Sequence, residues 1–511
     1  MKKPCHHKRP RLLPPIGLDL LWALVVLVGI FVFLNTHPIR PHDFWWHMAA
    51  GRHIVTTGEI PTVDTYSSTV RGIAYPAYTV YWLAETALYV VYNAGGPALS
   101  VFVHSLVVTS AYALTLWLCH LITRSWRIAA LATLFAAALG INDWNVRPQA
   151  FTFWFVPLQL LTIHAYRDRH GCWLLAAFPV TAALWVNCHG SFFIGLLLPG
   201  LWLAEELWLL WAPANDMTRS RCHMNATGAA TAFVSAALAC LVNPSGLGIV
   251  SYVRDLTTNS VVQHLVPEWA PPMFSDLHGA MFLFGLLTTA AVLALSPKRP
   301  SPFQMLSFLA FATLGLRTSR GGIWFGLALA PVLADHIAAL VARYSLQQGR
   351  VTNRGSQPLN VLFAALLLAS AVLTLPWLKK YLPLPAPKAG LVSSETPISA
   401  TEYLLTNHPP GPIFNDVGSG SYLAWAAQPD YPVFIDPRIE LYSADIWEDY
   451  IRISAAQPGW EEALARYGIQ TLILSPDTQP GLIQAACLSP AWTERYADSA
   501  AVVLTHHGPD D

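Results

Sequence analysis

One polar stretch, PHDFWWHMAAGRHI, directly follows the first apolar run of the sequence. Its acid, Asp43, lies just past that run, where Trp45 and Trp46 would lie at the headgroup depth that amphipathic rings prefer. A carboxylate at this level can bind a divalent cation or act as a general base toward a hydroxyl. The alternative is an interfacial acid that pairs with Arg40 or Arg52. Asp43 is therefore our first candidate catalytic residue and a candidate metal ligand.

A second acid lies later in the same polar segment. The stretch TVYWLAETALYVVYNAGG predicts a helix with aromatic and aliphatic residues on one face, and Gly95 and Gly96 predict its end. Glu85 lies within this helix and is the second candidate catalytic acid. The alternative is that Glu85 faces solvent or caps a neighbouring element.

The arginines that border other apolar runs indicate what such a site would hold. Arg147, Arg317 and Arg320 lie close to the ends of these runs, where an unpaired charge is costly. A guanidinium binds phosphate oxygens bidentately and does not lose its charge. Together with His189, these arginines could bind a phosphate or pyrophosphate at membrane level, although pairing between helices would also explain them. Lipid-linked sugars present phosphate at this depth, next to an apolar tail.

An acid that activates an acceptor and arginines that hold a leaving phosphate together indicate glycosyl transfer. For transfer from a lipid phosphate, stabilisation of the leaving group supplies much of the rate, through preorganised charges in a cleft with little water. We expect Trp45, Trp46, His47, Glu268 and Trp269 to line the substrate site. The sequence contains no Walker motif or GxSxG elbow that would favour another chemistry.

The composition is that of a membrane protein. Of 511 residues, 54% are hydrophobic and only 12% are charged, whereas roughly a quarter are charged in an ordinary soluble domain. The formal net charge of zero gives no indication of a nucleic-acid partner. Seven cysteines without a CxxC pair argue against a disulfide framework or a zinc site.

Apolar runs predict an α-helical, polytopic membrane protein with about 11 transmembrane helices, because about 20 apolar residues cross the roughly 30 Å hydrocarbon layer. The runs lie near 18–35, 98–119, 127–142, 150–165, 172–187, 190–211, 226–242, 278–295, 303–317, 321–341 and 358–377. If the basic N-terminus (1–17) is cytoplasmic, every loop on that side holds at least two basic residues, as the positive-inside rule requires. These residues are Arg124, Arg127, Arg167, Arg169, Arg219, Arg221, Lys298, Arg299, Arg343, Arg350 and Arg354.

This orientation gives a division of the chain into regions. A transmembrane domain over 18–377 would include a large external loop at 36–97, and a Pro-rich linker would follow at 378–389. Residues 390–511 then predict an extracytoplasmic α/β domain, with strands at PIFND, PVFID and QTLILS and helices at TEYLLTNH, ADIWEDYIRISAA and WEEALARYG. We expect the protein in a bacterial inner membrane, in contact with membrane lipids.

The C-terminal domain adds a candidate acceptor site. Asp416 and Asp436 each follow a predicted strand, and ligands often bind at the carboxyl ends of strands in α/β sheets. Arg438 and Glu440 complete this candidate site within VFIDPRIELY. The alternative is that Asp436, Arg438 and Glu440 form a salt-bridged turn.

The order of these elements resembles the GT-C class of integral membrane glycosyltransferases. The DFWWH stretch with Gly51 looks like the first-loop acid motif of oligosaccharyltransferase catalytic subunits, which implies a divalent cation, Mg²⁺ or Mn²⁺, held in part by Asp43. A closer likeness is to a group of bacterial inner-membrane proteins that share DFWWHxxxG, WLAE, RPQ, NxHG, NPxG, EW, RxxR and FxDxRxELY. The resemblance implies a GT-C-like fold over nearly the whole chain. The adjacent acid pair of many GT-C first loops is absent here.

We therefore expect a glycosyltransferase that moves a sugar from a polyprenyl phosphate or diphosphate to an envelope glycan, lipid or protein on the external face. The first alternative is a transporter or flippase of a lipid-linked glycan, which would place charges near the bilayer midplane on paired repeats. The sequence shows no internal repeat. The second alternative is a non-catalytic scaffold in envelope polysaccharide assembly.

Overall fold

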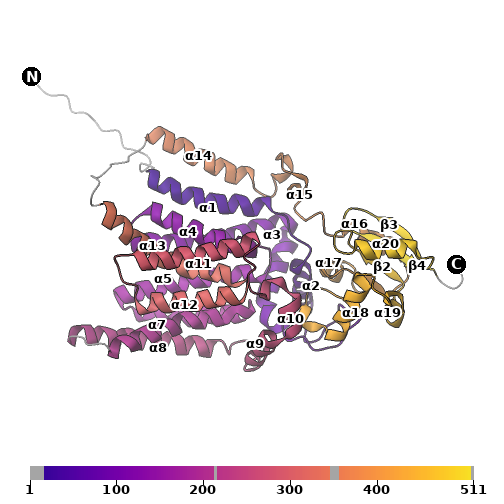
Figure 1. Cartoon of the computed structure of the whole chain (residues 1–511), viewed down its shortest axis with the longest axis horizontal. Helices are drawn as coiled ribbons and strands as arrows, with labels where there is room; N and C mark the ends of the chain where they lie inside the picture. The colour runs from indigo at the N-terminus through magenta and orange to yellow at the C-terminus, as the bar shows by residue number, and fades with distance from the viewer. Residues whose placement is uncertain (1–16, 212–215, 346–355, 508–511) are drawn as a thin grey trace, which may run out of the picture.

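A long bundle of helices carries a small α/β region at one end (Figure 1). This computed structural model describes residues 17–211, 216–345 and 356–507. The basic N-terminus, except for Gly17, and two of the predicted cytoplasmic arginines, Arg350 and Arg354, lie outside the described residues.

The helices of the bundle coincide with the predicted apolar runs. They are α1 (Leu18–Thr36), α3 (Tyr78–Thr123), α4 (Trp126–Gly140), α5 (Phe155–Arg169), α6 (Ala177–Val186), α7 (Phe193–Trp211), α8 (Asp216–Ala239), α11 (Leu277–Leu295), α12 (Pro302–Arg317), α13 (Gly321–Ser345) and α14 (Gln357–Leu373). Among the described residues, five helices are long and apolar enough to cross a membrane: α1, α3, α7 with the turn before it, α11 and α13. A membrane fold is therefore clear, whereas the count of 11 spans stays a prediction.

Small residues allow α13 to lie at the centre of the bundle. A Cβ atom at Gly326 of α13 would lie 2.9 Å from the carbonyl oxygen of Ala136 in α4, and one at Gly140 would lie 2.9 Å from Ile323. The backbones therefore approach closely, as is common between membrane helices. This packing fixes the end of α4, and the loop after α4 carries Arg147.

The segment 36–97, predicted to be external and called the external loop below, contains α2 (Asp43–Thr57) and the first half of α3. As predicted, Gly95 and Gly96 interrupt α3; both have non-helical backbone angles, and Gly96 has a φ of +62°. The α2 helix packs directly on α3 because Gly51 has no side chain, since a Cβ atom there would lie 2.2 Å from the carbonyl oxygen of Glu85. Gly51 therefore sets the distance between Glu85 and the polar residues of α2.

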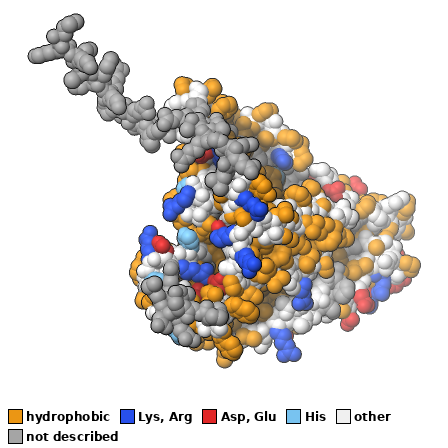
Figure 2. Space-filling view, turned by 60° about the vertical axis from the view of Figure 1, so that its left-hand side comes forward, with side chains coloured by type: hydrophobic (Ala, Val, Ile, Leu, Met, Phe, Trp, Pro, Cys, Tyr) orange, Lys and Arg blue, Asp and Glu red, His pale blue; other side chains and the backbone are white. Residues whose placement is uncertain are grey.

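Basic side chains gather at the end of the bundle away from the α/β region (Figure 2). Arg124 and Arg169 are exposed at the C-terminal ends of α3 and α5, and Lys298 and Arg299 are exposed between α11 and α12. This distribution agrees with the predicted cytoplasmic side, and the orientation itself stays a prediction.

The α/β region is built on a four-stranded sheet with strand order β1-β2-β4-β3. Its strands are β1 (Ile413–Asn415), β2 (Thr471–Leu474), β3 (Trp492–Ala497) and β4 (Val502–His506); β1 and β2 are parallel, and the other two pairs are antiparallel. Its helices are α16 (Ile398–Asn407), α17 (Val417–Ala426), α18 (Ala444–Ser454), α19 (Trp460–Arg466) and α20 (Pro480–Leu488). The predicted strands at β1 and β2 are confirmed, whereas β3, β4, α17 and α20 were not predicted.

The predicted strand PVFID is wrong as a member of this sheet. Val433 instead forms an isolated bridge with Ser67 of the external loop. The side-chain amide of Asn415 takes the place of strand pairing, because it donates to the carbonyl oxygen of Ile435 at 2.7 Å and accepts from the backbone N–H of Phe434 at 2.8 Å. The segment therefore joins β1 to the external loop.

A buried arginine holds the α/β region against the external loop. The Nη1 atom of Arg438 donates to Asp64 at 2.6 Å and to the hydroxyl of Tyr78 at 2.7 Å, and its Nε donates to Asp436 at 2.9 Å. None of the Arg438, Asp64 and Asp436 side chains is exposed. The ring of Trp46 lies 6.0 Å from the Arg438 guanidinium.

We expect Arg438→Met to destabilise the whole α/β end of the protein, because it leaves two buried carboxylates without their cationic partner. Loss of one partner from a buried ion pair typically costs about 3–5 kcal/mol. Thermal unfolding in detergent should show a clearly lower midpoint, and the external loop should be cut sooner by protease. Arg466→Met is the matched control, because the Arg466 side chain is 60% exposed. An unchanged midpoint for Arg438→Met would contradict the prediction.

Candidate active site

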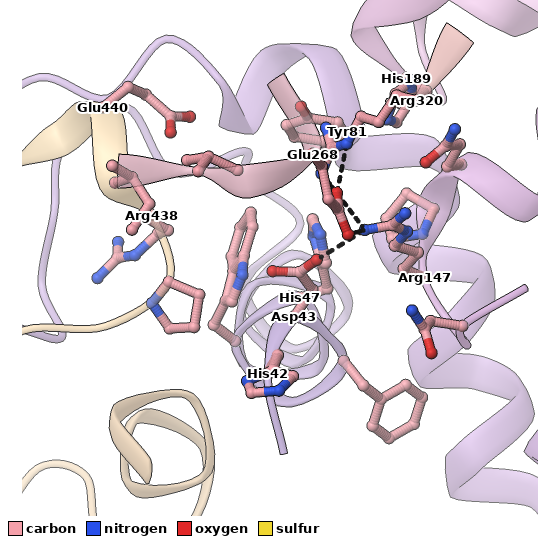
Figure 3. A pocket seen from close by; sticks show the side chains of 18 of the residues that line it. His42, Asp43, His47, Tyr81, Arg147, His189, Glu268, Arg320, Arg438 and Glu440 are labelled. Carbon is pink, nitrogen blue, oxygen red and sulfur yellow. Dashed lines mark hydrogen bonds and ion pairs between the residues drawn. The ribbon is translucent and has the colours of Figure 1, made fainter. Parts of the chain in front are cut away.

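A cavity of about 410 Å³ lies at the end of the bundle that carries the α/β region, between that region and the loops of the bundle (Figure 3). It brings together most of the predicted site residues from distant parts of the sequence. The predicted residues that line it are Asp43, Trp46, His47, Arg147, His189, Glu268, Trp269, Arg320, Arg438 and Glu440.

Four charged side chains meet on one wall of this cavity. The Nη1 atom of Arg147 lies 3.4 Å from Asp43 and 3.1 Å from both carboxylate oxygens of Glu268. Arg320 also pairs with Glu268, and its backbone N–H donates to the Glu268 carbonyl oxygen at 3.2 Å. Asp43 is the first residue of α2, and Arg147 directly precedes the 3-10 helix η2 (Pro148–Trp154). The cluster therefore joins the external loop to two loops of the bundle.

The arginines keep the Glu268 carboxyl ionised. Burial alone would raise the pKa of Glu268, but the guanidiniums of Arg320 and Arg147 outweigh it and hold this pKa well below its usual range. Burial would lower the pKa of Arg147, yet the carboxylates of Glu268 and Asp43 raise it further above its ordinary value. The wall thus holds fixed charges of both signs at neutral pH.

Asp143 is a member of the cluster that the sequence reasoning missed. Its carboxylate lies 3.4 Å from Nη2 of Arg147, one helical turn away in the sequence. Burial raises the pKa of Asp143 to about 7, although Arg147 acts in the opposite direction. The signal was present in NDWNVRPQ, where an acid and an arginine lie four residues apart in one short polar segment.

His189 and the aromatic rings form a second part of the cavity lining. Burial, Arg320 and Arg147 lower the pKa of His189 well below its usual value, so that the ring is neutral. The ring of Tyr81 lies 5.6 Å from His189, and Trp269 lies 5.9 Å from the Arg320 guanidinium. Tyr81 was not predicted as a site residue.

On α2, His47 lies one turn after Asp43 and also lines the cavity. Its Nδ1 atom lies 2.8 Å from Oε1 of Glu85, and both side chains are almost completely buried. Burial, with the positive field of Arg147 and Arg438 and with His189 nearby, lowers the pKa of His47 well below its usual value. Glu85 thus reaches the cavity through His47 and does not line it.

Four further predicted residues lie outside the cavity lining. Trp45 packs in an apolar cluster with Phe44, and Arg317 is exposed at the end of α12. Asp416 accepts from the backbone N–H of Ser419 and so caps α17. Asp436 is engaged by Arg438, which is the alternative that the sequence offered for these two residues.

The predicted divalent cation does not fit the arrangement of these side chains. Among the described residues, no group of three His, Cys, Asp or Glu side chains is placed to hold a metal ion. The three nearby carboxylates of Asp43, Asp143 and Glu268 all face the Arg147 guanidinium, which supplies the positive charge between them. The arginines therefore supply the positive charge at this wall of the cavity.

Comparison with solved structures identifies the fold. The chain is similar to the crystal structure of an Archaeoglobus fulgidus oligosaccharyltransferase tethered with an acceptor peptide that contains the NVT sequon, with a TM-score of 0.56, 12% identity, and coverage of 96% of this chain and 74% of that one. The fold is that of a GT-C glycosyltransferase. The archaeal oligosaccharyltransferase AglB from Archaeoglobus fulgidus, in complex with an inhibitory peptide and a dolichol-phosphate, matches with a TM-score of 0.55, 13% identity and the same coverage. The sequence matches no family model and no curated protein.

The fold therefore confirms the predicted GT-C class, while the likeness to the bacterial DFWWH group stays a prediction.

The raised pKa of Asp143 predicts a pH-dependent stability. In the folded protein, Asp143 holds its proton up to about pH 7. In the unfolded chain, an aspartate loses the proton with a pKa of about 3.9. Between these values the folded state binds more protons, so the contribution of Asp143 to stability falls as pH rises. The melting temperature of the wild-type protein should fall relative to that of Asp143→Asn across this range, and the difference should be constant above it. Asp477→Asn, which removes an exposed carboxyl, is the control; a constant difference for Asp143→Asn throughout would refute the assignment.

Proposed function

We propose that this chain is a membrane glycosyltransferase that moves a sugar from a polyprenyl phosphate or diphosphate to an envelope glycan, lipid or protein. The observation that carries the proposal is the cavity wall where Arg147 and Arg320 meet Asp43 and Glu268, at one end of a GT-C fold. Such a wall offers both a binding site for phosphate and a carboxylate for the acceptor.

The arginines would stabilise the departing lipid phosphate. Arg320 has 23% of its side chain exposed, while Arg147 has only 6%, so Arg320 presents its guanidinium to the cavity and Arg147 supports the charge from behind. When the bond between the sugar C1 and the phosphate oxygen breaks, negative charge grows on that oxygen. Fixed positive groups in a site with little water then lower the barrier. His189, next to Arg320 in the lining, would add a neutral hydrogen-bonding group.

Apolar side chains beside the arginines could receive the polyprenyl chain. Leu256 of α9 (Gly248–Thr258), Val262 and Leu265 of α10 (Ser260–Leu265), and Val266 line the same cavity. The dolichol-phosphate in the complex of the archaeal neighbour supports a lipid-linked donor here. We place the donor between α10 and the arginine wall.

The acceptor would enter from the opposite side, next to the α/β region. Glu440 lines the cavity and accepts a hydrogen bond from the hydroxyl of Tyr75 at 2.7 Å. Asp43 faces the same space from α2 and could orient an acceptor group. Of the predicted acceptor residues, Arg438 and Glu440 line the cavity, and Asp436 acts by holding Arg438. The acceptor peptide tethered in the archaeal neighbour supports an acceptor site in this fold.

We also propose the predicted topology for this chain. The N-terminus would be cytoplasmic, the loop at 36–97 and the α/β region at 390–511 would be external, and 378–389 would link them in a bacterial inner membrane. The exposed basic residues at the far end of the bundle support this orientation (Figure 2).

Asp43→Asn should abolish transfer and leave the protein folded and inserted, because the substitution keeps the shape of the side chain and removes its charge. Mass spectrometry of envelope glycans and lipid-linked intermediates from deletion cells, complemented with either form, would show a missing sugar and an accumulating sugar-charged polyprenyl phosphate. Full activity of Asp43→Asn at equal protein level would refute its role. Glycans that do not change even in the deletion would refute the proposed function.

The two arginines on either side of the turn between α12 and α13, Arg317 and Arg320, provide a matched pair. Arg320→Met should slow transfer by roughly 10²- to 10³-fold, the effect of removing one group that stabilises a developing negative charge. Arg317→Met should leave the rate within about twofold of the wild type, because this exposed side chain lies outside the cavity lining. The same glycan analysis, normalised to protein level, measures both variants. Equal effects at the two positions would refute the phosphate site.

Metal removal tests the role of Arg147 between the carboxylates. Washed membranes treated with EDTA should retain their transfer activity, because the guanidinium already supplies the positive charge that a cation would bring. Loss of activity that Mn²⁺ or Mg²⁺ restores would show that the arginine moves aside and a metal ion binds there.

A further inference from the structure

A buried histidine and a buried glutamate form a pair that opens onto the cavity from α2 and α3. The Nδ1 atom of His47 lies 2.8 Å from Oε1 of Glu85; the side chains are 6% and 0% exposed. Because Nδ1 faces the carboxylate, the other ring nitrogen, Nε2, is left for the cavity that His47 lines. Figure 3 shows His47 beside Asp43 at the centre of this site.

Among the described residues, the carboxyl group of Glu85 forms a hydrogen bond with this histidine and with no other group. Its second oxygen, Oε2, is buried and has no hydrogen-bond partner within the described chain. A glutamate with a purely structural role would be expected to satisfy both oxygens, since an unsatisfied buried acceptor is costly. The close approach of α2 and α3 at Gly51 is what allows the short contact.

We propose that His47 is the general base of the transfer reaction, with Glu85 as the residue that positions it, and that the acceptor nucleophile is a hydroxyl. The inference rests on the proposed function and assigns its acceptor chemistry.

His47 is better placed than Asp43 to take the proton. The Oδ2 atom of Asp43 lies 3.4 Å from the Arg147 guanidinium, whose positive charge makes this carboxylate less able to accept a proton. The His47 ring is held in one plane by Trp46, whose ring centroid lies 3.6 Å away, and by Tyr81 at 5.3 Å. The Nε2 atom therefore has a fixed direction, as a base needs. Asp43 can then orient the acceptor hydroxyl through a hydrogen bond.

The bonds and charges of the reaction balance with these groups. The acceptor oxygen forms a bond to C1 of the sugar and gives its proton to Nε2 of His47, while the bond from C1 to the lipid phosphate oxygen breaks. The electron pair of that bond leaves with the phosphate, next to Arg320. The imidazolium that forms donates from Nδ1 to Oε1 of Glu85 and later releases its proton to water. A carboxyl group that holds a histidine ring in one orientation in this way also occurs in the catalytic triad.

The surroundings of His47 determine its response to pH. The titratable and charged groups that face it are Glu85 and Tyr81 from α3, Asp43 from α2, and His189, Arg147 and Arg438 from the loops. Burial, followed by His189 and the two arginines, lowers the pKa of His47, so the ring is neutral at neutral pH. In the tautomer whose Nδ1–H donates to Glu85, Nε2 carries no proton and can accept one. Such a base suits an acceptor hydroxyl, which loses a proton as it attacks.

Complemented deletion cells test this inference with their own donor and acceptor. In spheroplasts, whose external pH can be set between about 5 and 8, the transfer of labelled sugar to the envelope is measured for wild type, His47→Gln, Glu85→Gln and His53→Gln. His47→Gln should be slower by about 10²- to 10⁴-fold. Glu85→Gln should also be slower, and its loss of activity at low pH should move to lower pH, because removal of the carboxylate makes His47 harder to protonate. His53→Gln, on the same helix but outside the cavity lining, should match the wild type.

Two further measurements separate chemistry from folding. Rates are divided by the amount of monodisperse protein on size exclusion, and His47→Ala is assayed with added imidazole, which should recover part of the rate. The hydroxyl assignment is tested by hydrolysis of the product, because a glycoside formed at oxygen and a glycosyl amide differ in their sensitivity to acid and to amidase.

Wild-type rates and pH dependence for His47→Gln, or a product linked through nitrogen, would overturn the inference and leave the proposed function intact. If envelope glycans are the same with and without the protein, the proposed function fails and the inference falls with it.

Discussion

The α/β end of this protein depends on the Arg438 guanidinium, which is buried between carboxylates from two distant segments. Asp64 belongs to the loop after α2, and Asp436 precedes the 3-10 turn of the α/β region. Burial of a charged side chain is costly without a partner of opposite charge, so the arginine and the two acids stabilise one another here. The interaction therefore makes the external loop and the α/β region one unit. The cavity lies where that unit meets the bundle.

This arrangement explains why the α/β region belongs to the site and does not simply cover it. Trp46 of α2 donates its backbone N–H to the hydroxyl of Ser421 in α17, and Arg52 donates to the carbonyl oxygen of Trp425. These contacts hold the face of α2 that carries Asp43 and His47 toward the cavity. Glu440 follows Arg438 by two residues and reaches the same cavity. A shift of the α/β region would therefore move the candidate base and the candidate acceptor site together.

The sequence predicted the fold class and most of the cavity, because the chemistry of these residues is visible without knowledge of their contacts. Apolar runs, the break at Gly95 and Gly96, and the strands at β1 and β2 follow from local composition. Contacts between residues far apart in the sequence could not be predicted from local composition. PVFID has the composition of a strand, yet it bonds with Ser67, which is more than 300 residues away. The pairing of His47 with Glu85 required the closeness of two helices at Gly51, and no spacing in the sequence specifies this closeness.

Arg317 and Arg320 show most clearly that residue type alone does not determine which side chain enters the cavity. Both border an apolar run and both could bind phosphate by residue type, yet Arg317 ends α12 in an exposed position. Arg320 lies past the turn, where its backbone N–H binds the carbonyl oxygen of Glu268 and its guanidinium binds the Glu268 carboxylate. That double contact directs one arginine into the cavity. Orientation is thus decided by tertiary hydrogen bonds, which the identity of the residue does not specify.

The charges of this site also differ from those of a site built on paired acids. Here a single acid opens α2, and the next polar side chain on the same face is His47, one helical turn later. Three carboxylates surround one guanidinium, so positive charge is already present where a cation would otherwise be needed. A site with a neutral imidazole and fixed arginines can deprotonate a hydroxyl and stabilise a leaving phosphate with groups of its own.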